Sequence, residues 1–190
     1  MQAEEVIAKF RNTGALLEGH FVLSSGLHSP VYLQCALVLQ HPQAAAEFAR
    51  SIAAHFQTEN IQTVAAPAIG GIVIGHEVAR ALGARFIWTE RQQGTMVLRR
   101  GFTVSPGERI LVVEDVVTTG GSTRETVAAL QSSGAEVVAA ASIIDRSSGK
   151  ADVGVPRIAL ATLGVPAVDE AVCEACQRGE PAIKPGSRKA

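Results

Sequence analysis

The sequence contains several short apolar runs, and these constrain the fold more than any other feature. Apolar and polar residues do not alternate in them, as they would in a strand with one face exposed to solvent. Helical patterns at 70–82 and 121–132 lie between some of them. Strands buried on both faces and connected by helices are typical of a parallel sheet with helices on either side. We therefore expect an α/β fold with a central parallel sheet flanked by helices. The runs that read as strands are 63–66, 85–89, 110–113, 136–144 and 158–163.

Length and composition set the class of protein. A chain of 190 residues suffices for one domain with a complete core. Its 47% hydrophobic and 18% charged residues favour a compact fold over disorder. A net charge of -1 gives no reason to expect nucleic acid or an anionic membrane as partner. Residues 1–10 lack the basic start of a secretory signal, and no apolar run is long enough for a bilayer, so we expect a cytoplasmic protein.

The stretch Ile110–Thr123 (ILVVEDVVTTGGST) joins a buried strand to two acids, a loop of glycines and hydroxyls, and a helix. Ligands of parallel sheets bind beyond the carboxyl ends of the strands, and a glycine-rich helix start favours phosphate. Glu114 and Asp115 would repel a phosphate, but they suit sugar hydroxyls or a divalent metal. The stretch therefore predicts a phosphorylated sugar, with its phosphate in the loop and its diol over the acids.

Other ligand motifs fit less well. No lysine follows Gly121, as a P-loop requires, and Gly70–Gly75 does not have the GxGxxG pattern of a dinucleotide site. The stretch His76–Arg80 lacks the second histidine of a zinc protease. The remaining alternative is that 114–123 is a polar strand-to-helix turn without a ligand.

The chain has three cysteines, Cys35, Cys173 and Cys176. An odd number in a cytoplasmic chain argues against a disulfide framework. Cys173 and Cys176 have the spacing of a metal or redox pair, but a closed zinc site needs about four ligands. Neither a second CxxC nor an HxxxH follows in the sequence. We therefore expect two reduced thiols and assign no metal-binding residue.

The acid pair and its loop resemble the hallmark of the type I phosphoribosyltransferases. Within that family the chain resembles the orotate phosphoribosyltransferases over most of its length. The C-terminal Cys173-x-x-Cys176 and Lys184–Arg188 are similar to one branch of these proteins. The stretches that carry the narrower resemblance are Phe21–Pro30 with Tyr32, Pro67–Gly71, Thr89–Arg91, Leu98–Phe102 and Ile144–Arg146.

The resemblance implies a magnesium-dependent reaction of pyrimidine biosynthesis. Orotate displaces pyrophosphate from 5-phosphoribosyl 1-diphosphate (PRPP) and gives orotidine 5′-monophosphate. Glu114, Asp115 and Arg91 would be catalytic, and the two acids would hold the ribose diol. The implied orotate-binding residues are Thr118, Arg146 and Tyr32. The implied PRPP-binding residues are Ala68, Ile69, Gly70, Gly71, Arg91, Glu114, Asp115, Val116, Val117, Thr118, Thr119, Gly120, Gly121 and Ser122.

The family's architecture implies a hood over the main sheet. The hood would comprise roughly residues 1–40 and 164–190, and the core 41–163. The polar segment 90–108 would be a lid that excludes water and reaches the site of a neighbouring subunit, so we expect a homodimer.

Arginines are the cationic candidates of the lid. Many family members carry lysines and a histidine where this chain has Gln92–Thr95, and lysine at the positions of Ser24 and Gly70. Arg91, with Arg99 and Arg100, would then have to face the diphosphate.

Two other functions fit the same fold. A purine or uracil phosphoribosyltransferase would not need Arg146, because a neutral base has no carboxylate to pair with it. A regulator that senses PRPP and binds nucleic acid would carry a basic extension, and the sequence shows none.

Overall fold

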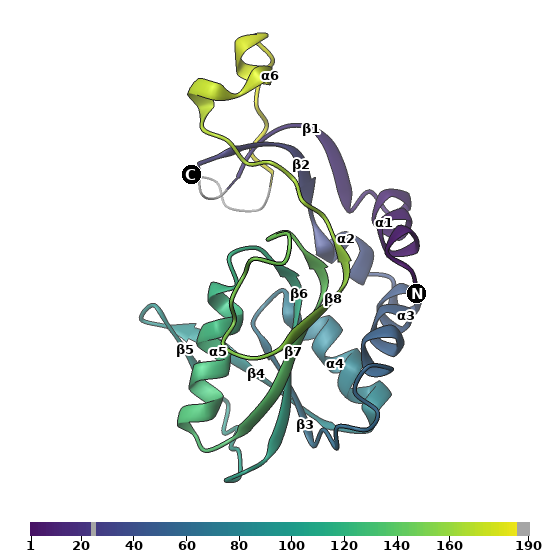
Figure 1. Ribbon diagram of the computed structural model, residues 1–190, viewed down its shortest axis with the longest axis vertical. Helices are drawn as coiled ribbons and strands as arrows, with labels where there is room; N and C mark the ends of the chain where they lie inside the picture. The colour runs from purple at the N-terminus through teal and green to yellow at the C-terminus, as the bar shows by residue number, and fades with distance from the viewer. Residues whose placement is uncertain (24–25, 186–190) are drawn as a thin grey trace.

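The computed structural model describes residues 1–23 and 26–185 and places one six-stranded sheet between helices on both faces (Figure 1). The strand order is β5-β4-β3-β6-β7-β8. Neighbouring strands are parallel except β5, which pairs antiparallel with β4 at the edge. The expected α/β fold with a central parallel sheet is confirmed. The strands are β3 (Thr63–Pro67), β4 (Arg85–Gln92), β5 (Thr95–Leu98), β6 (Arg109–Val117), β7 (Glu136–Asp145) and β8 (Arg157–Thr162).

Burial on both faces explains the continuous apolar runs. Every residue from 110 to 114 in β6 is buried, so this strand has no solvent-facing side that would require polar residues. The sheet has a core on each face. Helices α1 (Ala3–Asn12), α3 (Pro42–Ala53) and α4 (Gly71–Leu82) cover one, and α5 (Gly121–Ser132) covers the other.

The helices are held by their apolar faces. Phe48 and Ile52 of α3, and Ile74 of α4, are fully buried in the first core, and Leu130 of α5 in the second. Full burial of such a side chain contributes roughly 1.5–3 kcal/mol. Because α5 packs this way, its N-terminus is fixed directly after the last residues of β6.

A smaller lobe stands above the main sheet in Figure 1. It contains the antiparallel pair β1 (Leu16–Val22) and β2 (His28–Leu33), and the chain returns to it near its C-terminal end in η1 (Glu170–Val172) and α6 (Glu174–Gln177). The His28 amide donates to the carbonyl of Val168 at 2.8 Å, and the Ile183 amide donates to the carbonyl of His20 at 2.8 Å. The N-terminal hairpin and the C-terminal segment are thus joined.

Two segments change their secondary structure along their length. In the apolar run 31–39, β2 ends at Leu33 and Cys35–Leu39 forms the short helix α2; a short apolar run suits either state. The polar segment 90–108 contains the end of β4 and all of β5. Gln93 (φ 49°) and Gly94 (φ 86°) form a two-residue turn between β4 and β5, with the positive φ angles of a type I′ hairpin.

No helix in the part of the chain that the structure describes is both long and apolar enough to cross a membrane.

Candidate functional site

A cavity of about 550 Å³ lies between the carboxyl ends of the central strands and the segment that follows β2. Three separate stretches of the core meet there, although they are far apart in the sequence. The lining residues that the sequence predicts as site residues are Ile69, Gly70, Asp115, Val116, Thr118 and Arg146. The other lining residues from the segment after β2 fall within the expected hood 1–40, but the sequence does not single them out as site residues; they are Leu33, Gln34, Cys35, Ala36, Leu39 and Gln40.

Glu114 and Asp115 lie near the carboxyl end of β6, and no cationic side chain is paired with either of them among the described residues. Glu114 is buried, and its carboxylate accepts a hydrogen bond from the Thr123 hydroxyl at 3.5 Å. Burial, together with the charge of Asp115, raises the pKa of Glu114 to about 9. Burial also raises the pKa of Asp115. Among the described residues neither acid forms an ion pair, so both are suited to ligand hydroxyls or a cation.

The loop after β3 lies directly against these acids. A Cβ atom on Gly70 would come within 2.8 Å of Asp115 Oδ1, and one on Gly71 within 2.9 Å of the Val113 carbonyl oxygen. At Gly71 the close neighbour is backbone, so only glycine lets the loop approach β6 this closely, whereas at Gly70 the neighbour is the Asp115 side chain, which a larger residue would displace. A cis peptide bond joins Ala68 to Ile69, and the Ile69 side chain is 84% exposed. The loop can present its backbone to a ligand that the acids also contact.

The loop between β6 and α5 has the conformation of an anion site. Gly120 has φ 79°, and a Cβ there would approach Val153 Cγ1 within 2.9 Å, so glycine is required for two reasons. Thr118, Thr119 and Ser122 are exposed around the start of α5. The first amides of a helix have no intrahelical partners and attract anions. The predicted phosphate loop therefore has a suitable geometry.

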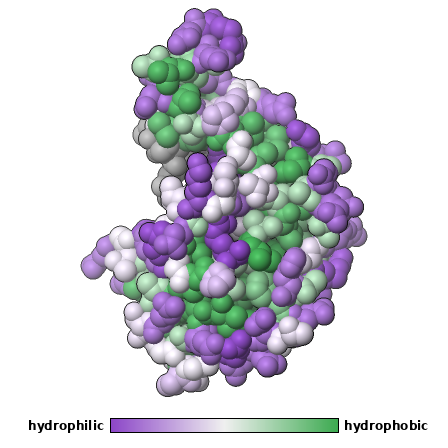
Figure 2. Space-filling view, viewed as in Figure 1, coloured by the Kyte–Doolittle hydropathy of each residue, from purple (hydrophilic) through white to green (hydrophobic). Residues whose placement is uncertain are grey.

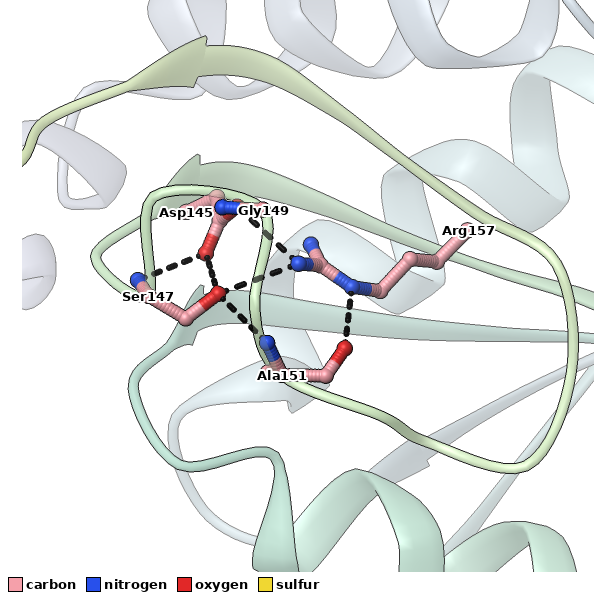
Figure 3. A network of polar contacts seen from close by, with 5 residues as sticks. All are labelled: Asp145, Ser147, Gly149, Ala151 and Arg157. Atoms are coloured by element: carbon pink, nitrogen blue, oxygen red, sulfur yellow. Dashed lines mark hydrogen bonds and ion pairs between the residues drawn. The ribbon is translucent and has the colours of Figure 1, made fainter.

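Asp145 anchors the loop that follows β7 (Figure 3). Its buried carboxylate accepts hydrogen bonds from the Ser147 amide at 2.7 Å, the Ser147 hydroxyl at 2.6 Å and the Gly149 amide at 2.8 Å. Arg157 Nη2 lies 3.0 Å from the same carboxylate. Burial alone would raise the pKa of Asp145, but these donors outweigh it and lower the pKa. Asp145 thus fixes the backbone that carries Arg146.

Arg146 lies at the cavity wall with unused hydrogen-bonding capacity. Its amide donates to the Val117 carbonyl at 2.8 Å, which ties it to β6. Its Nε is buried and has no hydrogen-bond partner among the described residues. Burial lowers the pKa of the guanidinium. A buried nitrogen of a guanidinium without a partner is costly unless a ligand supplies an acceptor, and a carboxylate is the acceptor that best matches the geometry of the guanidinium.

Some predicted residues do not line the cavity. The Val117 side chain is buried, and only its carbonyl serves the site, through Arg146. Tyr32 does not line the cavity, but its hydroxyl donates a hydrogen bond to Oε1 of the lining residue Gln34 at 3.0 Å. Arg91 lies on the exposed β4–β5 hairpin, where Nη1 is 2.8 Å from Glu125 Oε2.

The other lid arginines are also paired. Arg99 Nη1 lies 3.3 Å from a Glu90 oxygen, and Arg100 Nε lies 2.6 Å from the other. Their predicted role at the diphosphate would require these ion pairs to open.

Cys35 is a site residue that sequence reasoning missed. It is buried at the start of α2 and lines the cavity beside Asp115. Burial raises the pKa of its thiol, and the nearby Asp115 charge adds to the shift. Nothing in the sequence around it distinguishes it from a core cysteine, because its position depends on how the segment after β2 packs against the main sheet.

Comparison with known proteins places these features in one family. Residues 36–157 match the family model described as phosphoribosyl transferase domain. The chain is 52% identical to orotate phosphoribosyltransferase of Pelotomaculum thermopropionicum, and the match covers 100% of both chains. It is 51% identical to that of Desulforamulus reducens, over 100% of this chain and 99% of the relative.

Solved structures with the same fold agree. Orotate phosphoribosyltransferase from Aeropyrum pernix is 26% identical with a TM-score of 0.69, over 83% of this chain and 93% of that one. The Mycobacterium tuberculosis enzyme in complex with PRPP is 26% identical with a TM-score of 0.67, over 84% of this chain and 94% of that one.

Proposed function

The chain belongs to the phosphoribosyl transferase family, and from this premise we propose how its cavity carries out the orotate reaction. The reaction moves ribose 5-phosphate from PRPP to orotate, releases pyrophosphate and serves pyrimidine biosynthesis. The observation that carries the assignment of the cavity is Arg146 Nε, which is buried near Asp115 and Thr118 and has no hydrogen-bond partner within residues 1–23 and 26–185. It fits a ligand with a carboxylate at one end and a ribose at the other.

The ribose is held by charge and backbone. The hydroxyls and first amides of the loop 118–122 receive the 5′-phosphate, and the loop 68–71 offers its backbone to the diphosphate. Glu114 and Asp115 accept hydrogen bonds from the diol and lie near C1, where positive charge develops as the bond to pyrophosphate breaks. Fixed groups in a partly buried site contribute chiefly by positioning and by electrostatic stabilisation.

Orotate binds through Arg146. The guanidinium pairs with the orotate carboxylate, and Thr118 lines the same wall. The segment 33–40 forms the opposite wall, with Tyr32 behind Gln34. Asp145 takes no part in contacting the base and instead holds the Arg146 loop in place.

An assay with each base tests this function. Untagged protein with magnesium and PRPP should consume orotate, and should leave adenine, guanine, hypoxanthine and uracil unchanged. Replacing Arg146 with alanine should raise the KM for orotate roughly tenfold to a hundredfold, as expected for loss of a charged hydrogen bond. The exposed Arg80, paired with Glu77 on α4, provides the control Arg80→Ala, which should not change KM. An unchanged KM in Arg146→Ala would remove the assignment.

Magnesium is the cofactor that we propose. Carboxylate oxygens are the ligands that it prefers. Burial raises the pKa of both Glu114 and Asp115, and a bound cation would favour their ionised forms. These two residues would hold the ion, which neutralises charge on the diphosphate. Activity should disappear with a chelator and return with added magnesium.

A shared lid in a homodimer is also part of the proposal. The β4–β5 hairpin projects from the edge of the sheet (Figure 1). Arg91 pairs with Met96, one position before the Gln92–Thr95 pair that closes the turn. An exposed projecting hairpin with cationic side chains is suited to reach the diphosphate of a neighbouring subunit.

We place the reaction in the cytoplasm, where three free cysteines would remain reduced.

A further inference from the structure

Four side chains that can bind metal meet in the smaller lobe, away from the cavity. They are His20 in β1, His28 at the start of β2, and Cys173 and Cys176 at the start of α6. All four donor atoms lie within 4.8 Å of one another. Both histidines and Cys173 are buried, and Cys176 is half-buried. The four residues lie outside the region 36–157 that the family model matches.

The individual separations suit tetrahedral coordination. His20 Nε2 lies 3.5 Å from Cys173 Sγ and 3.6 Å from Cys176 Sγ, and His28 Nδ1 lies 3.3 Å from Cys176 Sγ. A tetrahedral zinc ion with its usual bond lengths places sulfur and nitrogen ligands about 3.5 Å apart. The two histidine nitrogens, His20 Nε2 and His28 Nδ1, lie at a hydrogen-bond distance of 2.7 Å. A tetrahedral zinc ion would separate them to about 3.3 Å, which requires a small movement of the two rings.

The tautomer of His20 favours metal binding. Its Nδ1 lies 2.9 Å from the carbonyl oxygen of Glu180, which can only accept, so Nδ1 carries the proton. The lone pair of Nε2 therefore points into the cluster. Hydrogen bonding of the second ring nitrogen to a carbonyl is the usual way in which proteins orient a metal-binding histidine.

The lobe needs support of this kind. Neither η1 nor α6 contains a buried residue, and the apolar residues Val172 and Ile183 are 62% and 60% exposed. Figure 2 shows this end of the molecule as a narrow projection with a hydrophilic tip. A two-stranded hairpin is marginal by itself, and small lobes without a core often depend on a metal.

We propose that His20, His28, Cys173 and Cys176 bind one structural zinc ion, which fastens the C-terminal segment to the β1–β2 hairpin. Two thiolates and two imidazoles form a closed set of four ligands, and sulfur ligands select zinc over magnesium. The site is therefore separate from the proposed catalytic magnesium. The sequence favoured two reduced thiols because no second ligand pair follows the CxxC, whereas the fold supplies the pair from the N-terminal hairpin.

Metal content of the untagged, full-length protein tests the proposal. After growth with zinc and dialysis against metal-free buffer, mass spectrometry should find one zinc per chain. The variants Cys176→Ser and His28→Asn should lose it. Cys35→Ser and His55→Asn replace a cysteine and an exposed histidine outside the cluster, and both should retain it. Equal zinc in ligand and control variants would overturn the proposal.

Cobalt substitution of the wild-type protein gives a second test that does not depend on how the variants fold. Cobalt at this site should produce thiolate-to-metal charge-transfer absorption and the intense visible bands of tetrahedral coordination, and zinc should abolish both. A cobalt spectrum without thiolate absorption would contradict the proposal. So would a Cys173–Cys176 disulfide in freshly prepared protein.

Discussion

At the scale of residues, the site depends on placing negative charge where the protein alone cannot neutralise it. Glu114 and Asp115 end a strand that is buried on both faces, and burial raises the pKa of both carboxyls. A ligand that brings hydroxyls, a cation and developing positive charge makes up for this cost. We propose Arg146 as the partner of a ligand carboxylate, because its Nε is buried without a hydrogen-bond partner among the described residues.

Stability should depend on pH through Glu114. Its pKa rises in the fold from 4.5 to about 9, so folding favours the protonated form. This contribution is complete below the ordinary pKa and is lost as the pH rises towards 9. The variant Glu114→Gln should therefore lose less thermal stability than the wild type between pH 5 and pH 9. If the melting temperatures of the two proteins changed with pH in the same way, Glu114 would be ionised over the whole range from pH 5 to pH 9.

The kinetics of Asp115→Asn should separate catalysis from binding. Loss of the charge near C1 should lower kcat by roughly a hundredfold or more. Binding of the 5′-phosphate by the loop 118–122 should change little, because Asp115 does not contact it in our account. Steady-state kinetics, with ribose 5-phosphate as a competitive inhibitor, measure both quantities. An equal loss in kcat and in inhibitor affinity would mean that Asp115 only binds the ground state.

At the scale of elements, short loops at the strand ends position the chemistry. The loop after β7 is held by the Asp145 network of Figure 3, and the loop after β3 is pressed against Asp115. Each loop is anchored by a rigid strand, which limits how far its functional groups can move.

Breaking the Asp145 network should affect both stability and orotate binding. In Asp145→Asn the nearly buried Arg157 loses its charged partner, which typically costs about 3–5 kcal/mol. The KM for orotate should rise as the Arg146 backbone loosens. Asp152→Asn, at a side chain that is 82% exposed, is the control. Because the fold lowers the pKa of Asp145, the ionised carboxylate stabilises the fold less at acidic pH. The difference in free energy of unfolding between Asp145→Asn and the wild type, measured with urea, should therefore shrink at acidic pH. A constant difference would argue against an ionised Asp145.

The sequence predicted the core elements well and the hood poorly, for physical reasons. Burial of β6 and the glycine-rich start of α5 are local properties, so Ile110–Thr123 was sufficient to predict them. The pairing of His20 with Cys173 spans 153 positions and depends on a hairpin meeting a distant segment. The lining role of Cys35 likewise depends on tertiary packing. The spacing of Cys173 and Cys176 is visible in the sequence, but the two histidines beside them and the cavity that Cys35 lines depend on contacts between distant segments.

At the scale of the whole molecule, the cavity lies between two parts with different support. One wall belongs to the main sheet with a core on each face, and the other follows directly from β2 in the weakly supported lobe. The zinc that we infer would therefore influence the cavity through the hairpin. Removing the zinc should raise the KM for orotate while the main sheet remains folded. After the zinc is removed with a chelator and magnesium is added back, steady-state kinetics measure the KM and circular dichroism reports whether the sheet is still folded. An unchanged KM would mean that the lobe holds its shape without metal.

A shared lid predicts complementation between two inactive variants. Arg91→Ala alters the hairpin, and Asp115→Asn alters the cavity. In a mixed dimer one site combines an intact cavity with an intact lid from the other subunit, so mixing should restore roughly a quarter of wild-type activity. Sites served by their own subunit's lid would show no recovery after mixing and subunit exchange.

The most direct test of the central claim is a crystal structure of the protein with orotate, magnesium and a non-reactive PRPP analogue. We expect the 5′-phosphate at Thr118–Ser122, the ribose diol at Glu114 and Asp115, and the orotate carboxylate at Arg146. Ligands that occupy a different part of the protein, or an orotate carboxylate turned away from Arg146, would contradict it.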